Sequence, residues 1–400
     1  MSTPAYLDHA ATTAIRPEVI EAIAAQMGHL GNASSLHTAG RAARRVVEES
    51  RELIADRLGA TPSEVVFTSG GTEADNLAVL GAWRQRHTVD PARSRLLVST
   101  IEHHAVLDPV GRLVDAEGAK VDWLEVDRAG VVDAEAAAAA ITQAADQLAL
   151  VSMMWANNEV GTLQPVAQVA AAARERGVPF HTDAVQAVGH VPVAFGECGA
   201  DLLSLSGHKI GGPQGVGALL VRRDVQLTPL TFGGGQERQL RSGTLDVASI
   251  RGLAVAVAAA TDELDAERAR LIALRDKLIQ GALQLGLGIE LSGAHTEGSA
   301  EDRLPGNVHL RVPGCDGDSL LYLLDAAGVQ CSTGSACQAG VPQPSHVLLA
   351  MGYADEQARG ALRLTLGHTS TEADVDAVIA ALPGAVERAR RAHQATAGRG

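Results

Sequence analysis

Short apolar runs alternate with helical segments between residues 61 and 221. Seven runs rich in Val, Leu and other apolar residues predict strands, and several stretches between them show helical spacing or runs of Ala. The predicted strands cover 64–70, 95–100, 120–126, 148–154, 178–183, 201–206 and 216–221. This alternation predicts an α/β fold, with a mostly parallel sheet covered by helices on both faces. In such sheets, functional residues gather at the carboxyl ends of the strands.

The pattern changes after the glycine run at 233–235. One long helix is expected over about 249–285, because helical spacing continues through that stretch. Further strands are expected at 307–312 and 361–366. Thr371, followed three residues later by Asp374, forms a capping-box pattern that predicts the start of a final helix.

The 400-residue chain is therefore expected to form two domains. The large α/β domain would span 15–258. The smaller α+β domain would combine 1–14 with 259–400, and the N-terminal segment would pack between the two.

Charge and hydropathy exclude several classes of partner. The formal net charge is −14, which argues against sequence-independent binding to nucleic acid or to an anionic membrane. No apolar stretch is long enough to span a bilayer, and the N-terminus lacks the basic start and apolar core of a secretion signal. We expect a cytoplasmic protein with neither membrane nor nucleic acid as its partner.

Lysine is rare in this chain, and its scarcity narrows the chemistry. The only lysines are Lys120, Lys209 and Lys277. Lys209 lies in SLSGHKIGGPQGVG, on a glycine-flanked loop after a predicted strand, where a lysine is well placed to form a Schiff base. The alternative is an ordinary solvated loop lysine.

Two further motifs give this lysine a chemical context. TSGGTEADN (68–76) lies where a strand meets a helix, so free backbone N–H groups there can bind an anion. Alone, it reads more simply as a glycine turn with Thr72 as a helix cap. Asp183 ends the strand in HTDAVQAVG. A phosphate cradle, a strand-end carboxylate and an imine-forming lysine are the partners that pyridoxal 5'-phosphate requires.

The fourth motif, CSTGSACQAG (331–340), is rich in small residues and predicts an exposed loop. Cys337, on this loop, is a candidate reactive thiol. Cys198 and Cys315 are expected to be inert. The six-residue gap between Cys331 and Cys337 is not a usual zinc spacing, so no metal site is predicted.

In order along the chain stand YLDHAATT, TSGGTEADN, EHHAVLD, NNEVG, TDAVQ, SGHKIGGP, GGGQERQLRSGT, STGSAC and LRLTLGHTS. With these motifs, the chain resembles the cysteine desulfurases of the class V aminotransferase superfamily. The likeness is to the group I, nitrogen-fixation and iron–sulfur-cluster type, and is greatest for actinobacterial members. It implies a transferase of fold type I that depends on pyridoxal 5'-phosphate (PLP). The large domain would contain a mostly parallel sheet of the seven-stranded type, and the small domain would carry a mobile loop with the cysteine.

The resemblance also assigns roles around the cofactor ring. Lys209 would form the Schiff base and later take the Cα proton of the substrate. Asp183 would keep the pyridine nitrogen protonated, and Gln186 and Asn158 would hydrogen-bond the phenolic oxygen. His103 would stack on the ring and handle protons; His104 is the rival in EHH, but His103 directly follows Glu102, as the family's histidine does.

Further roles concern the phosphate, the substrate and the sulfur. The phosphate would be held by Gly71, Thr72, Ser206 and His208, and by Thr244 from the other subunit, which implies a homodimer. Arg363, helped by Asn32, would grip the carboxylate of L-cysteine. Cys337 would attack the substrate sulfur, becoming a persulfide and releasing L-alanine.

The resemblance implies delivery of this sulfur to an acceptor protein, such as an iron–sulfur scaffold. The alternatives are a selenocysteine lyase or another class V aminotransferase, which would not need Cys337, or a sulfur-carrier subunit without catalysis. Two positions depart from the family pattern: Ala33 stands where many members have proline, and Gln239 where glycine is common. Cys331 is expected to be a bystander.

Overall fold

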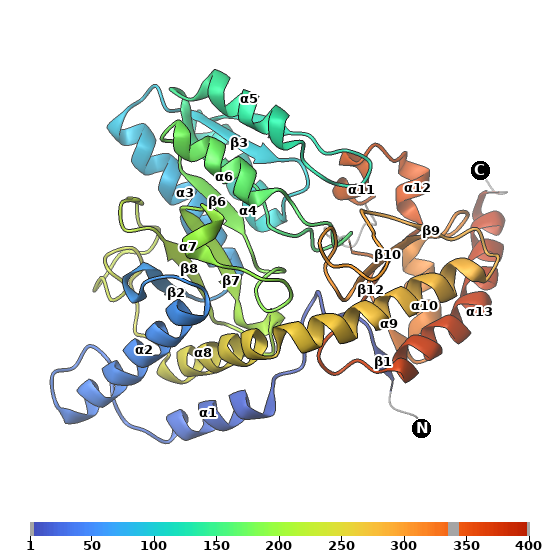
Figure 1. Ribbon diagram of the computed structural model, residues 1–400, viewed down its shortest axis with the longest axis horizontal. Helices are drawn as coiled ribbons and strands as arrows, with labels where there is room; N and C mark the ends of the chain where they lie inside the picture. The colour runs from blue at the N-terminus through green and yellow to red at the C-terminus, as the bar shows by residue number, and fades with distance from the viewer. Residues whose placement is uncertain (1–3, 335–343, 398–400) are drawn as a thin grey trace.

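The computed structural model describes residues 4–334 and 344–397. Its largest element is a seven-stranded sheet of order β2-β8-β7-β6-β5-β3-β4 (Figure 1). The strands are β2 (Val65–Thr68), β3 (Arg95–Ser99), β4 (Lys120–Leu124), β5 (Leu148–Ser152), β6 (Phe180–Asp183), β7 (Leu202–Ser206) and β8 (Gly217–Val221). β8 runs opposite to the other six strands, so it is antiparallel to both of its neighbours, β2 and β7. All seven strands predicted from the apolar runs are present.

The sheet is buried on both faces because its strands are apolar at consecutive positions. In β2, Val65 and Phe67 join the core on one face, whereas Val66 joins a separate core on the other. The helices that belong to this part of the chain are α1 (Pro17–Met27), α2 (Thr38–Arg57), α3 (Gly71–Val89), α4 (His104–Glu117), α5 (Ala134–Ala144), α6 (Val166–Glu175), α7 (Phe195–Cys198) and α8 (Val247–Asp262). Short 3-10 turns occur at η1 (Pro62–Glu64) and η2 (Gly207–Lys209).

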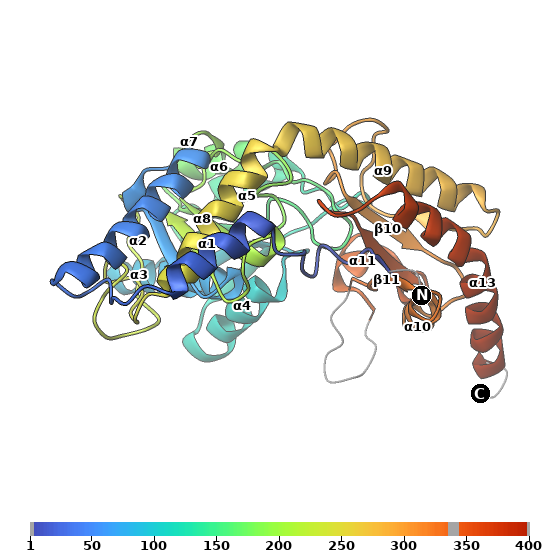
Figure 2. The ribbon, with the colours of Figure 1, turned by 90° about the horizontal axis from the view of Figure 1, so that it is seen from below.

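A second, smaller unit surrounds an antiparallel sheet of order β12-β10-β9, and its core is separate from those of the large sheet (Figure 2). Its strands are β9 (Glu290–Leu291), β10 (Asn307–Arg311) and β12 (Ala361–Thr365). The N-terminal strand β1 (Ala5–Tyr6) pairs in parallel with β11 (Val329–Gln330). The accompanying helices are α9 (Leu264–Gln284), α10 (Gly317–Asp325), α11 (His346–Ala350), α12 (Asp355–Arg359) and α13 (Glu372–Ala397).

The prediction of one continuous helix over about 249–285 is wrong, because this stretch contains two helices. α8 ends at Asp262 and α9 begins at Leu264. Near the end of α8, the hydroxyl of Thr261 donates to the carbonyls of Val257 and Ala258, at 2.8 and 3.0 Å. Such bonds from a threonine back to its own helix bend helices. The domain limits expected from the sequence stay a prediction.

Candidate active site

A cavity of about 410 Å³ lies at the carboxyl ends of β6 and β7. The sequence-predicted residues that line it are Gly71, Thr72, His103, Asn158, Asp183, Gln186, Ser206, His208, Lys209 and Arg363. Asn32 and Thr244 are exposed and do not line it, and Cys337 lies outside the described residues. The chain thus brings together ten of the thirteen predicted residues, from motifs almost 300 positions apart.

The anion cradle forms where β2 passes into α3. Gly70 has φ +153°, which other residues rarely adopt, and a Cβ on Gly71 would lie 2.7 Å from Val185 Cγ2. Both glycines are therefore needed for this tight turn. The first N–H groups of α3 have no partner inside the helix, and Gly71 and Thr72, the first two residues of this helix, line the cavity. A phosphate group fits this arrangement.

Lys209 ends the turn η2 and extends into the cavity. Its Nζ donates to the carbonyls of Ala10 and Ala11, at 2.5 and 2.8 Å. Burial, and next the charge of Arg363, lower the pKa of the Lys209 ammonium to about 8. A lysine that loses its proton this readily is suited to attack a carbonyl carbon.

Asp183 lies at the end of β6, where its Oδ1 accepts a hydrogen bond from the N–H of Val185 at 2.9 Å. Burial, and next the neighbouring carboxyl of Asp75, raise its pKa to about 7. A cationic ring nitrogen placed against Asp183 would reverse this shift, because an opposite charge favours the carboxylate. The site therefore suits a protonated pyridine.

Asp75, on α3, is a cavity residue that the sequence reading missed. Its Oδ1 lies 3.5 Å from His181 Nε2, which is itself 3.1 Å from Ser204 Oγ. The other ring nitrogen of His181 lies 2.9 Å from Ser152 Oγ. Burial raises the pKa of Asp75 to about 7 and lowers that of His181 to about 4. The sequence feature that could have indicated Asp75 is the aspartate of TSGGTEADN, one helical turn after the two glycines.

Of the two candidate histidines, only His103 lines the cavity. Its Nδ1 accepts from the N–H of Ala105 at 3.0 Å, which caps α4 and leaves the ring proton on Nε2. Burial, and next the charge of Lys209, lower its pKa to about 4. His104 instead lies 3.1 Å from Asp108, which is largely exposed. The geometry favours His103 as the ring partner.

Arg363, on β12, is held from two sides. Its Nη2 pairs with Asp8 Oδ1 at 2.9 Å, and its Nη1 donates to the carbonyl of Asn158 at 3.0 Å. Its Nε is buried and has no hydrogen-bond partner among the described residues. Because Arg363 lines the cavity, the N–H groups that Asp8 and Asn158 do not use suit a carboxylate there. Asp8 was missed by the sequence reading, although it belongs to the YLDHAATT motif.

The remaining predicted residues are also fixed by neighbouring segments. Gln186 donates from Nε2 to the carbonyl of Ala10 at 3.0 Å. His208 Nδ1 lies 3.3 Å from Thr12 Oγ1, and burial followed by the charge of Lys209 lowers the His208 pKa to about 4. The turn after Asp8 thus contacts three site side chains, which belong to two separate motifs.

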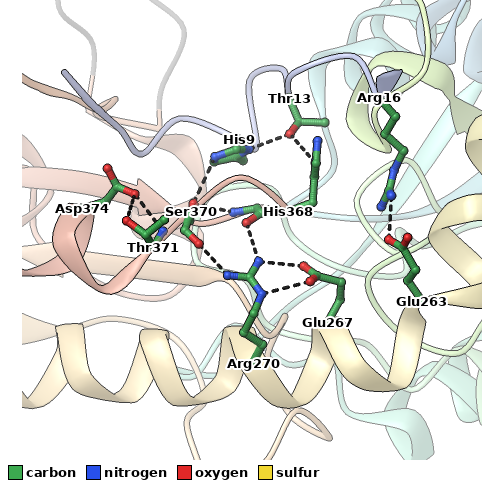
Figure 3. Close-up of polar contacts among 11 residues, drawn as sticks. His9, Thr13, Arg16, Glu263, Glu267, Arg270, His368, Ser370, Thr371 and Asp374 are labelled. Atoms are coloured by element: carbon green, nitrogen blue, oxygen red, sulfur yellow. Dashed lines mark hydrogen bonds and ion pairs between the residues drawn. The ribbon is translucent and has the colours of Figure 1, made fainter. Parts of the chain in front are cut away.

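A polar network behind the cavity anchors this turn (Figure 3). His9 Nδ1 lies 2.6 Å from Thr13 Oγ1, and His9 Nε2 lies 3.2 Å from Ser370 Oγ. Arg270, on α9, donates to the carbonyl of Ser370 at 2.5 Å. Because the two carbonyls that accept from Lys209 directly follow His9, this network also fixes the position of the lysine.

The two ends of the segment that carries Cys337 lie beside or near the cavity. Ser332 and Gly334 line it on one side of the segment. On the other side, the hydroxyl of Ser345 donates to Glu159 Oε2 at 2.5 Å. Cys331 is buried in the core of the smaller unit, and burial raises its thiol pKa to about 12. That thiol is in a poor environment for reaction.

A second cavity, of about 490 Å³, lies at the opposite edge of the large sheet and contains none of the predicted residues. Within residues 4–334 and 344–397, no group of three or more His, Cys, Asp or Glu residues is arranged to hold a metal ion. No helix in that part of the chain combines the length and apolar character needed to cross a membrane.

Comparisons with known proteins agree with this geometry. The family "Aminotransferase class-V" matches residues 5–378. The chain is 58% identical over 394 residues to an IscS-like cysteine desulfurase of Mycobacterium tuberculosis, covering 98% of this chain and 99% of that protein. It is 43% identical over 387 residues to cysteine desulfurase IscS of Methanosarcina thermophila, covering 96% and 92%.

A comparison with solved structures supports the same family. A solved structure of a NifS-like protein from Rickettsia africae matches with a TM-score of 0.83 at 32% identity, covering 96% of this chain and 99% of that one. The predicted α/β fold class, with its mostly parallel sheet, is confirmed. The chain belongs to the class V aminotransferase family and, within it, to the cysteine desulfurases of the IscS type.

Proposed function

We propose that this cysteine desulfurase uses pyridoxal 5'-phosphate to convert L-cysteine to L-alanine, leaving the sulfur as a persulfide on Cys337. The observation that carries the proposal is one cavity in which Lys209, Asp183 and Arg363 meet beside the ends of the segment that bears Cys337. The lysine can form an imine with a pyridine aldehyde, and the aspartate can pair with its ring nitrogen. The arginine can bind the carboxylate of an amino acid.

The residues present fit this cofactor. Lys209 would hold it covalently, Asp183 would pair with its ring nitrogen, and His103 would lie against the ring. Gln186 and Asn158 would bond its phenolic oxygen. The phosphate would be bound by Gly71, Thr72, Ser206 and His208. When bound, the cofactor supplies an electron sink that weakens bonds at the substrate Cα and Cβ.

The chain's own groups supply binding and proton transfer. Arg363, held by Asp8, orients the substrate carboxylate. Lys209, freed from the cofactor, takes the Cα proton, and its lowered pKa makes the neutral amine available near neutrality. His103 carries its ring proton on Nε2 and can exchange it with the substrate thiol.

Sulfur transfer then balances as an exchange of bonds. The sulfur of Cys337 forms a bond to the substrate sulfur, and the bond from that sulfur to Cβ breaks. The electron pair stays with the carbon, which gains a proton and leaves as L-alanine. No external oxidant is needed, because the new S–S bond is formed as the C–S bond is reduced.

We propose a homodimer in which Thr244 completes the phosphate site of the partner and Asn32 lies at the same interface. Both are exposed in the single chain, and the two stretches that contain them, 27–36 and 232–244, also carry exposed apolar side chains. Those side chains, with their exposed fractions, are Met27 (76%), Leu30 (92%), Leu36 (88%) and Phe232 (83%). Apolar surface of this kind commonly marks an interface between subunits. The acceptor of the sulfur is proposed to be an iron–sulfur scaffold protein.

The experiment compares two cysteine variants. Cys337→Ser should still bind the cofactor and L-cysteine, but should form no protein persulfide and almost no L-alanine. Cys331→Ser should keep most activity, because that thiol is buried. Alanine and sulfide should be measured together, with and without a scaffold protein. Turnover by Cys337→Ser at the wild-type rate would favour a selenocysteine lyase or another class V enzyme instead.

A further inference from the structure

Glu237 forms a buried ion pair that lies outside the active-site cavity. Its side chain is fully buried, and Arg51 Nη1 and Nη2 donate to its two oxygens at 2.9 and 2.7 Å. The N–H of Phe67, on β2, donates to the same carboxylate at 3.0 Å. A buried carboxylate with three donors holds its own backbone firmly to the elements that supply them.

The segment around Glu237 connects β8 to α8, and Figure 1 shows it beside α2 at one end of the larger unit. Arg241 provides a second anchor, because its Nε donates to Glu73 Oε1 at 3.0 Å. Glu73 directly follows Thr72 in the first turn of α3, and it also accepts from the N–H of Ser69 at 2.6 Å. The segment is thus fixed to α2, β2 and α3.

Between the two anchors, the backbone takes an unfavourable shape. Arg238 and Gln239 have φ of +53° and +63°, a conformation that side chains other than glycine disfavour. A bridge between the backbones of Glu237 and Arg241 closes the turn. Such strain persists only where the surroundings over-determine it, and it is often found near functional sites.

The anchored turn connects directly to Thr244. The side-chain oxygen of Gln236 accepts from the N–H of Gly243 at 2.8 Å, so neighbours of Glu237 and of Thr244 are joined. Thr244 itself is exposed. We propose that Glu237 and Arg241 are positioning residues, which hold this segment in the shape that presents Thr244 to the phosphate site of the partner subunit. The inference rests on the proposed shared site.

The proposal predicts an effect in the partner's site, which subunit mixing detects. Glu237→Gln alone should lower desulfurase activity at least tenfold. Mixed with Lys209→Ala under conditions of subunit exchange, it should form heterodimers in which one site carries both lesions and the other neither. Activity should recover to about a quarter of the wild-type value, because half of the dimers are mixed and each has one intact site.

A matched control and a second variant make the result interpretable. Glu48 also pairs with Arg51, at 3.1 Å, but lies on α2, so Glu48→Gln should keep wild-type activity. If Glu237→Gln fails to fold, Arg241→Gln replaces it, because that ion pair is partly exposed and less important for folding. The same recovery with Lys209→Ala is expected.

A mixture of Thr244→Ala with Lys209→Ala tests the shared site separately from the positioning role of Glu237 and Arg241. If this pair recovers activity and the anchor variants do not, the positioning role is wrong and the shared site stands. If this pair also fails, despite proven exchange, the shared site is wrong and the inference falls with it. Loss of activity in Glu48→Gln equal to that in Glu237→Gln would show that Arg51, not the segment, is responsible.

Discussion

Asp8 and Arg363 lie 355 positions apart, and their side chains meet at 2.9 Å beside the active-site cavity. Asp8 belongs to the N-terminal segment and Arg363 to β12 of the smaller unit. The turn that follows Asp8 also supplies the two carbonyls that accept from Lys209, which lies on the larger unit. One short segment therefore sets the distance between the proposed Schiff-base lysine and the proposed carboxylate-binding arginine.

The pairing should be visible as a coupling free energy. In a double-mutant cycle with Asp8→Asn and Arg363→Met, we expect the two changes in the free energy of unfolding to differ from additivity by about 1–3 kcal/mol. The reason is that Arg363 is buried, so loss of Asp8 leaves a charge without its counter-ion. Urea unfolding of the four proteins measures this energy. Additivity within about 0.5 kcal/mol would contradict the pairing.

Gln239 tests the strained turn from another direction. Its φ is +63°, and glycine adopts this conformation without a steric penalty. Gln239→Gly should therefore raise the free energy of unfolding by up to about 1 kcal/mol, after the entropy of glycine in the unfolded chain is counted. Gln239→Val should lower it, because a β-branched residue is least tolerated there. Thermal unfolding monitored by fluorescence gives both signs; equal effects would show that φ is not positive in solution.

Much of the fold could be predicted from local patterns in the sequence. Strands such as β2, β5 and β7 were predictable because they are buried on both faces and consist mainly of apolar residues. The edge strand β4 is only partly buried. Three parts of the site were predictable for a related reason: Lys209, Asp183 and the glycine turn. Each lies at or just after the carboxyl end of a strand, and parallel strands bring their carboxyl ends to one edge.

Other features depend on partners that are distant in the sequence. Nothing near Asp8 indicates that it faces Arg363, since the contact exists only after β1 and β12 have joined the smaller unit. Asp75 reads as an ordinary helix residue until α3 packs on the sheet beside His181. The break at Glu263 was not predicted, because helical apolar spacing continues on both sides of it and neither Gly nor Pro stands there.

Asp75 should make the stability of the cofactor-free protein depend on pH. Its folded pKa is about 7, raised by burial from 3.8, so the folded state binds a proton more tightly than the unfolded state. Stability from this group is complete below about pH 4 and is lost as the pH rises to about 7. Asp75→Asn should flatten that decline, because an amide does not titrate.

The measurement is the thermal midpoint of the apoprotein across this pH range. The control is Asp108→Asn, which removes a carboxyl that is largely exposed. It should leave the slope unchanged. The slope that remains in Asp75→Asn has contributions of both signs. Asp183, whose pKa is also about 7, and Glu102, whose pKa burial raises well above its usual value, lower stability as the pH rises. Histidines whose pKa is lowered to about 4 raise stability over the same range; they are His9, His103, His181 and His208. A slope identical to that of the wild type would mean that Asp75 is not protonated in the folded state.

Lys209 should be the only lysine that binds the cofactor, and its lowered pKa gives the reaction a recognisable pH dependence. Burial, and next Arg363, lower its pKa to about 8, so the neutral amine that attacks an aldehyde appears far below the usual value of 10.5. The rate at which pyridoxal 5'-phosphate binds covalently to the apoprotein should therefore rise with pH to a midpoint near pH 8. Borohydride reduction and digestion should place the adduct on Lys209, and Lys209→Ala should abolish it. Lys120 is exposed and Lys277 pairs with Asp376 at 2.7 Å, so alanine at either position should change neither the rate nor the adduct. An adduct on Lys277, or a midpoint above pH 10, would remove Lys209 from its proposed role.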